Sequence, residues 1–204
     1  MQIHTFPVGD IGANCYLLVS EDKQGLLIDP GAEPAKLITA IQNLGIGIKY
    51  IVLTHGHLDH IGAVEELRKQ TGSKVLIHEL DNPCLTDSKL NLSYFFGSPI
   101  LCGEADMLIK DGEQITLGNE TFTVLHTPGH TAGGVCLVGA EVVFTGDTLF
   151  AGSVGRTDFP GGSMDTLIES IKGKILTLEP HTKVYPGHGP TTTVEEEKRN
   201  NPYL

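Results

Sequence analysis

Short apolar runs separated by turn residues dominate the first half of the chain. Their β-branched and aromatic side chains, bounded by Gly, Asp and Asn, are typical of strands. The predicted strands are Ile3 to Val8, Asn14 to Val19, Gly25 to Ile28, Lys49 to Leu53 and Lys74 to Ile77. Apolar residues spaced by three and four predict two helices: one begins at Pro34 and ends at Gly45, and the other follows residue 60 and ends at Gly72.

The second half returns to short strands and closes with two helices. The predicted strands are Met107 to Lys110, Gln114 to Leu117, Thr121 to Leu125, Gly134 to Val138, Val142 to Thr145 and Lys183 to Tyr185. A helix is predicted from Asp165 to Leu178, and a capping box formed by Thr193 and Glu196 opens a short last helix. Strands followed by helices, twice over, indicate an α/β fold with two sheets faced by helices, for which a four-layer αββα sandwich is one solution. Because no linker or repeat divides the chain, we expect a single domain over residues 1–204.

Residues 80–106 show no regular period. Pro and Gly interrupt the segment, yet it carries Tyr94, Phe95 and Phe96. A long irregular segment within a compact domain is usually functional or disordered, and the aromatic content argues against disorder. We therefore favour a flap or pocket wall, with the three aromatic side chains either lining a substrate mouth or joining the core.

Composition and charge narrow the possible partners and compartments. The net charge is −11, from 14 basic and 25 acidic residues without a basic block, which disfavours nucleic acid and anionic membranes as partners. Four cysteines without a C-x-x-C pair indicate buried free thiols and a reducing compartment. Neither a signal peptide nor a membrane-spanning apolar stretch is visible, so we expect a cytoplasmic protein.

One motif carries most of the chemistry, between the strand that ends at Leu53 and the following helix. It reads H-x-H-x-D-H and supplies His55, His57, Asp59 and His60. Imidazole nitrogens and carboxylate oxygens suit zinc, and also iron or manganese. A polar turn with solvated histidines is the alternative, but four such residues seldom fall together by chance. The motif therefore predicts a metal site on a loop held by the scaffold.

Three further candidates each follow a predicted strand and are flanked by Gly or Pro: His130, Asp147 and His188. Gly and Pro there allow sharp turns and a close approach to a buried ion. Five His and two Asp exceed the needs of one tetrahedral ion but suit two adjacent divalent ions, most simply zinc. Such a pair can hold a bridging hydroxide as nucleophile, which predicts a hydrolase without a Ser or Cys nucleophile.

The order of these residues resembles the metallo-β-lactamase superfamily, whose fold is the αββα sandwich of two mixed sheets. The resemblance implies the following roles: His55, His57 and His130 hold one ion, Asp59, His60 and His188 hold the other, Asp147 bridges them, and Asp59 and Asp147 are the catalytic carboxylates. It also implies that Asp29, which follows a strand in an Asp-Pro-Gly turn, braces the metal loop from behind.

Within that superfamily, Gly146 to Phe150 and the following Gly155-Arg156 are similar to glyoxalase II, the thioesterase acting on hydroxyacylglutathione. The resemblance assigns Arg156 to substrate binding. We expect no helical C-terminal domain like that enzyme's, because the sequence looks like the short, single-domain glyoxalase II-like hydrolases. The expected function is hydrolysis of a small-molecule thioester.

Two other functions stay open at this stage. The nearest is a persulfide dioxygenase with one iron, held by residues that match His55, His130 and Asp147. The intact Gly187 to Pro190 segment favours the hydrolases over that family. A non-catalytic metal-binding scaffold would need a broken ligand set, whereas all seven candidates are present.

Overall fold

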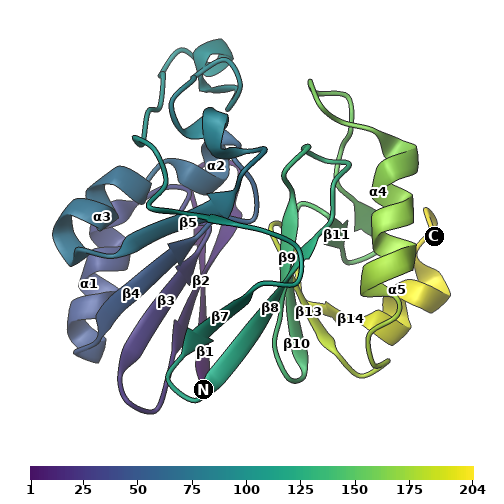
Figure 1. Ribbon diagram of the computed structural model, residues 1–204, viewed down its shortest axis with the longest axis horizontal. Helices are drawn as coiled ribbons and strands as arrows, with labels where there is room; N and C mark the ends of the chain where they lie inside the picture. Colours follow the sequence, from purple (N-terminus) through teal and green to yellow (C-terminus); the bar gives the residue numbers. More distant parts are fainter.

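Two six-stranded sheets face each other in the structure, a computed structural model that describes residues 1–204 (Figure 1). The first sheet has the order β1 (Gln2–Val8), β2 (Ala13–Val19), β3 (Gln24–Ile28), β4 (Gly47–Val52), β5 (Lys74–His78) and β6 (Met107–Ile109). Strands β3 to β6 run parallel to one another, and β1 and β2 are antiparallel. The sheet is therefore mixed.

The second sheet is mixed as well. Its order is β14 (Thr192–Thr193), β13 (Lys183–Pro186), β10 (Val142–Gly146), β9 (Val135–Val138), β8 (Glu120–His126) and β7 (Gln114–Leu117). Only β10 and β13 are parallel, and the other neighbours are antiparallel. A two-stranded ribbon, β11 (Leu149–Phe150) with β12 (Ser153–Val154), follows β10.

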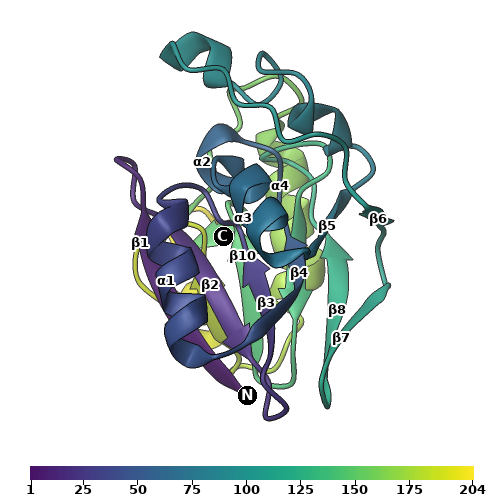
Figure 2. The same ribbon diagram turned by 90° about the vertical axis from the view of Figure 1, so that its left-hand side faces the viewer.

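Helices cover the outer face of each sheet. Helices α1 (Pro34–Leu44) and α3 (Val64–Thr71) lie on the first sheet, and α4 (Met164–Ser170) and α5 (Val194–Asn200) flank the second (Figures 1 and 2). None of the helices has the length and apolar character needed to cross a bilayer. The four layers are those of the predicted αββα sandwich, whereas the single domain stays a prediction.

Three apolar cores explain why the strands read as continuous hydrophobic runs. Successive side chains of a strand point to opposite faces, and here both faces are covered. In β2, Leu17 packs under α1 and α3 while Leu18 packs between the sheets. In β10, Phe144 faces the space between the sheets and Val143 packs beneath α4.

The helix after the H-x-H-x-D-H motif differs from the prediction. The chain forms a short α2 (Leu58–Ile61), breaks, and resumes as α3. At the break the backbone of Gly62 lies so near the Gly31 carbonyl that a Cβ there would sit 2.3 Å from its oxygen. Asp59 and His60 therefore stand on a helix instead of a turn. The helix predicted from Asp165 likewise changes character, because α4 passes into a π-helical turn, η3 (Ile171–Ile175).

The irregular segment 80–106 projects beyond the sheets, at the top of Figures 1 and 2. It contains two single 3₁₀ turns, η1 (Asn82–Leu85) and η2 (Ser93–Phe96). Tyr94, Phe95 and Phe96 are exposed, which excludes a core role for these side chains. Phe96 and Leu92 line a pocket, as expected of a pocket wall.

Candidate metal centre

The predicted site residues meet at one edge of the sandwich, the edge at which α2 lies in Figure 1. Parallel strands end at the same edge, and the loops that leave them carry the functional side chains. Asp29 follows β3, His55 follows β4, His130 follows β8, Asp147 follows β10 and His188 follows β13. Residues separated by up to 159 positions in the sequence thus share one site.

Two clusters of potential ligands lie side by side. His55, His57 and His130 form the first, and Asp59, His60 and His188 form the second; within each, the ligand atoms lie within 4.8 Å of one another. Asp147 stands between them. Its Oδ2 is 3.6 Å from Nε2 of His130 and 3.6 Å from Nε2 of His188, and its Oδ1 is 3.4 Å from Nε2 of His60.

The spacing of these atoms fits divalent metal ions. Two atoms bound tetrahedrally to one zinc at 2.0–2.1 Å lie about 3.3 Å apart. His57 Nδ1 is 2.9 Å from His130 Nε2, and His188 Nε2 is 3.2 Å from Asp59 Oδ2. Nε2 of His55 and Oδ1 of Asp147 are buried without any hydrogen-bond partner. Such orphaned polar atoms are costly unless an ion satisfies them.

Asp29 supports the motif loop from beneath. Its Oδ1 accepts a hydrogen bond from the Thr54 backbone N–H at 2.7 Å, and its Oδ2 accepts one from the Thr54 hydroxyl at 2.6 Å. The same Oδ2 is 3.0 Å from Nδ1 of His60, which leaves Nε2 of that ring to point into the site. Asp29 itself adopts φ 50°, an uncommon conformation for a residue with a Cβ. That Asp29 braces a metal loop stays a prediction, and these hydrogen bonds are the contacts through which it would do so.

Other ring orientations are set in the same way. Nδ1 of His130 donates to the Arg156 carbonyl at 2.7 Å, and Nδ1 of His55 is 3.1 Å from the Thr54 hydroxyl. A hydrogen bond on one ring nitrogen fixes the tautomer and aims the other nitrogen. In both rings Nδ1 is engaged by these contacts, so Nε2 is the nitrogen that faces the centre.

Charge within the site is concentrated and unbalanced. Burial, reinforced by the other rings, holds the pKa of His55 well below its usual value, and burial and the adjacent His130 lower the pKa of His57 to about 3. These imidazoles are therefore neutral, the form that binds metals. Burial alone would lower the pKa of His60, but Asp147 and two neighbouring carboxylates outweigh it and raise that pKa to about 10. The carboxylates therefore stabilise positive charge at the centre, whether on His60 or on a bound cation.

Sequence interpretation missed Asp81, a residue that ties two of the ligand loops together. Its side chain accepts hydrogen bonds from Gly56 N–H at 3.1 Å, the Thr131 hydroxyl at 2.7 Å and Gly133 N–H at 2.7 Å. Burial raises its pKa, although these hydrogen bonds oppose the shift. Gly56 lies between His55 and His57, so Asp81 sets the distance between the motif and the loop of His130. No local motif marks this role, because its partners are 25 to 52 residues away.

A pocket of about 350 Å³ opens over the candidate centre. Arg156, which the resemblance assigned to substrate binding, lies in the wall of this pocket. Its guanidinium forms a two-pronged pair with Asp158, with Nε–Oδ1 at 2.7 Å and Nη2–Oδ2 at 2.6 Å, and lies 3.9 Å over the ring of Phe159. The cation expected to hold the substrate therefore already has a carboxylate partner.

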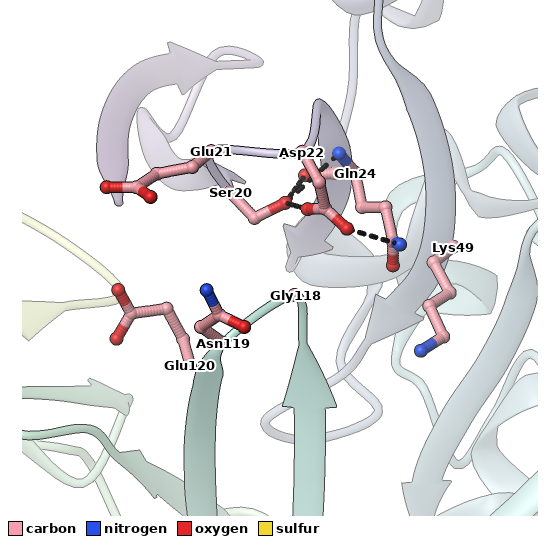
Figure 3. Close-up of a pocket in the computed structure, with 8 residues that line it drawn as sticks. All are labelled: Ser20, Glu21, Asp22, Gln24, Lys49, Gly118, Asn119 and Glu120. Carbon is pink, nitrogen blue, oxygen red and sulfur yellow. Dashed lines mark hydrogen bonds between the residues drawn. The ribbon is translucent and has the colours of Figure 1, made fainter.

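A second cavity, of about 620 Å³, is larger than the pocket over the candidate centre and shares no lining residue with it (Figure 3). The turns between β2 and β3 and between β7 and β8 border it, and its lining contains no apolar side chain. Among its lining residues are Glu21, Asp22 and Glu120, but no histidine or cysteine. The ligand set therefore places the metal chemistry in the smaller pocket.

A family model described as the metallo-beta-lactamase superfamily matches residues 8–188. The chain belongs to that superfamily. It is 42% identical over 207 residues to a Bacillus subtilis (strain 168) protein named "Probable metallo-hydrolase YqgX". The alignment covers 100% of this chain and 98% of that protein. It is 39% identical over 212 residues to "Hydroxyacylglutathione hydrolase GloC" of Haemophilus influenzae, with 100% and 98% covered.

Solved structures show the same fold. The crystal structure of BLEG-1, described as a B3 metallo-beta-lactamase, superposes with a TM-score of 0.96 at 40% identity and covers 100% of this chain and 99% of that chain. The crystal structure of TTHA1623 in a di-iron-bound form has a TM-score of 0.87 at 38% identity, with 98% and 100% covered. These matches confirm the αββα fold predicted from the sequence.

Proposed function

We propose that the protein is a two-metal hydrolase that cleaves thioesters of the hydroxyacylglutathione type. The observation that carries this proposal is the convergence of seven side chains. Six of them have ligand atoms 2.9–3.6 Å from the ligand atom of another, and the ligand atom of His55 lies within 4.8 Å of those of His57 and His130. The likeness to a relative named for hydroxyacylglutathione hydrolysis supports the choice of substrate class.

In this proposal each residue has a definite task. His55, His57 and His130 hold one cation, Asp59, His60 and His188 hold the other, and Asp147 contacts both. Two bound cations would polarise the thioester carbonyl and bring the pKa of a water molecule towards neutrality. Oδ2 of Asp59 lies 3.2 Å from Nε2 of His188 and 3.6 Å from Nε2 of His60, which would put this carboxylate beside a bound water as its proton acceptor.

Zinc is the metal we propose, because imidazole and carboxylate ligands in tetrahedral spacing suit it. The di-iron form of a related structure supports iron as the alternative. Action in the cytoplasm stays a prediction.

The direct test is release of free thiol from S-lactoylglutathione by the zinc-reconstituted protein. Asp147→Asn removes a carboxylate that serves both clusters, so we expect turnover to fall at least about a hundredfold. Asp165→Asn, an exposed change of the same chemistry at the start of α4, should leave turnover intact. Undiminished cleavage by the Asp147→Asn protein would contradict the proposal.

One smaller ligand set supports a second candidate, the persulfide dioxygenase. His55 and His130 have ring centroids 4.7 Å apart, and His130 Nε2 is 3.6 Å from Asp147 Oδ2, which is compact enough for one iron. That function predicts one iron per chain and oxygen uptake with a persulfide substrate. It leaves His57, Asp59, His60 and His188 without a task, which is why we rank it second.

Hydrolysis of a β-lactam is a third candidate, supported by the close superposition on a structure described as a B3 metallo-beta-lactamase. The same centre could act on a lactam carbonyl, since the chemistry differs only in the leaving group. Parallel assays with nitrocefin and S-lactoylglutathione distinguish the two, and the proposal requires a higher kcat/KM for the thioester.

A further inference from the structure

The pocket over the candidate metal centre has a largely apolar wall. Seven of its thirteen lining residues are hydrophobic: Ile11, Leu58, Leu92, Phe96, Phe150, Val154 and Phe159. Two of them also project into solvent, Phe96 with 63% of its surface exposed and Ile11 with 55%. Water contact by large apolar side chains at the mouth of a site usually marks a surface that binds a ligand.

The same wall offers little to an anion. Arg156 is the only lysine or arginine that lines the pocket, and an exposed two-pronged pair with Asp158 offsets its charge. The hydrogen bonds from Arg156 lower the pKa of Asp158 to about 2, so the pair stays intact well below neutral pH. Lys89 is the one basic residue of segment 80–106. It lies 5.5 Å from the ring of Tyr94, and neither residue lines the pocket. The chain's net charge of −11 adds no long-range attraction for an anionic substrate.

From this wall we infer that the proposed thioesterase prefers thioesters with apolar, uncharged groups, bound against Phe96 and Ile11, over the charged glutathione thioesters. The inference rests on the proposed function and specifies its substrate class. In the reaction, water adds its oxygen to the thioester carbonyl carbon and the C–S bond breaks, giving a carboxylic acid and a thiol that takes up a proton. Neither product is oxidised or reduced. A glutathione thioester, which carries several charges, is then cleaved with a higher KM than a neutral thioester of the same acyl group.

Binding can be measured without turnover, by titrating the zinc-loaded protein with two thioethers in a calorimeter. S-hexylglutathione and S-hexyl-N-acetylcysteamine share the alkyl chain and differ in their charged groups. We expect the neutral thioether to bind at least about tenfold more tightly, because no unpaired lysine or arginine lines the pocket wall to repay the desolvation of the carboxylates of glutathione. Equal or tighter binding of S-hexylglutathione would overturn the inference.

The chain supplies a matched pair of variants for the same titration. Phe96→Ser should weaken the neutral thioether about tenfold, the effect expected when one aromatic side chain no longer buries apolar surface. Phe95→Ser is the control, because Phe95 is 70% exposed on the same 3₁₀ turn but does not line the pocket. An equal effect of both changes, or none from Phe96→Ser, would contradict a role for this wall. The role would also be contradicted if the wild-type protein were a dimer that dissociates in the Phe96→Ser variant. In that case the Phe96 ring would contact a second copy of the chain instead of a substrate.

Kinetics separate this inference from the proposed function. Hexanoyl-N-acetylcysteamine should have a higher kcat/KM than hexanoylglutathione, and Phe96→Ser should raise KM for the neutral substrate with little change in kcat. Cleavage of both thioesters with preference for the charged one would overturn the inference and leave the thioesterase standing. Phe96-dependent thioether binding without cleavage of any thioester would overturn the proposed function and leave the ligand class standing.

Discussion

Replacing Asp81 by Asn tests how the two ligand loops are held together. In the wild-type protein, Oδ2 of Asp81 accepts from Gly56 N–H and the Thr131 hydroxyl, and Oδ1 accepts from Gly133 N–H. An amide has one accepting oxygen, so in either orientation its NH₂ group faces a backbone N–H that loses its partner. Asp81 is 2% exposed, and water cannot easily replace that partner.

The expected cost follows from these contacts. One buried unsatisfied donor costs about 1–3 kcal/mol, and the two remaining hydrogen bonds lose their charge assistance, about 1 kcal/mol in total. Removal of a buried charge offsets part of this, because burial already raises the pKa of Asp81. We expect a net loss of about 2–3 kcal/mol in the free energy of unfolding. Looser spacing between His57 and His130 should also weaken zinc binding about tenfold or more.

Urea unfolding and competition with a zinc chelator measure the two effects of Asp81→Asn. The control is Asp106→Asn, because Asp106 also accepts a backbone N–H, from Val75, and pairs with Arg68 but is partly exposed and distant from the ligand loops. That variant should lose less than about 1 kcal/mol and keep its zinc affinity. An Asp81→Asn protein that matches Asp106→Asn in both measurements would refute the reasoning.

Three further outcomes are expected. Gly187→Ala should abolish metal binding but keep the far-ultraviolet circular dichroism, because the new Cβ would lie 2.2 Å from Oδ1 of Asp147; full metal content would contradict this. Burial and an adjacent histidine ring lower the pKa of His78, so the unfolded chain binds a proton that the folded chain does not. The free energy of unfolding should therefore fall as the pH drops below about 6.5, less steeply in His78→Gln than in the control His181→Gln. Burial raises the pKa of Cys84 to about 12, so a disulfide reagent at pH 8 should label this thiol only after unfolding.

Much of the architecture could be predicted because its causes are local. The glycines that end α1 and α3, Gly45 and Gly72, adopt φ 63° and 69°, conformations that favour glycine after a helix. Strands such as β2 could be predicted because apolar side chains follow one another along the sequence and fill both faces of the strand. All four cysteines are free, and Cys15, Cys102 and Cys136 are buried as predicted, whereas Cys84 is only half-buried. The break between α2 and α3 was not, because it depends on close contact of Gly62 with a distant loop.

The candidate site shows the same division. The ligand residues could be proposed because each follows a strand within a recognisable segment. Asp81 could not, since its function is a set of hydrogen bonds to partners far along the chain. The pairing of Arg156 had a usable signal, an aspartate two residues later, which would have weakened the prediction that this arginine is free to bind substrate. The position of the aromatic side chains on η2 could be decided only from the structure, because the sequence was compatible with a place in the core and with a place at the pocket mouth.

The central claim is that seven side chains hold two divalent metal ions. The most direct measurement is the metal content of the zinc-reconstituted, dialysed protein by inductively coupled plasma mass spectrometry, alongside the Asp147→Asn variant. The account predicts two zinc ions per chain, with loss of at least one in the variant. One tightly held iron per chain, or wild-type zinc content in the Asp147→Asn protein, would contradict it.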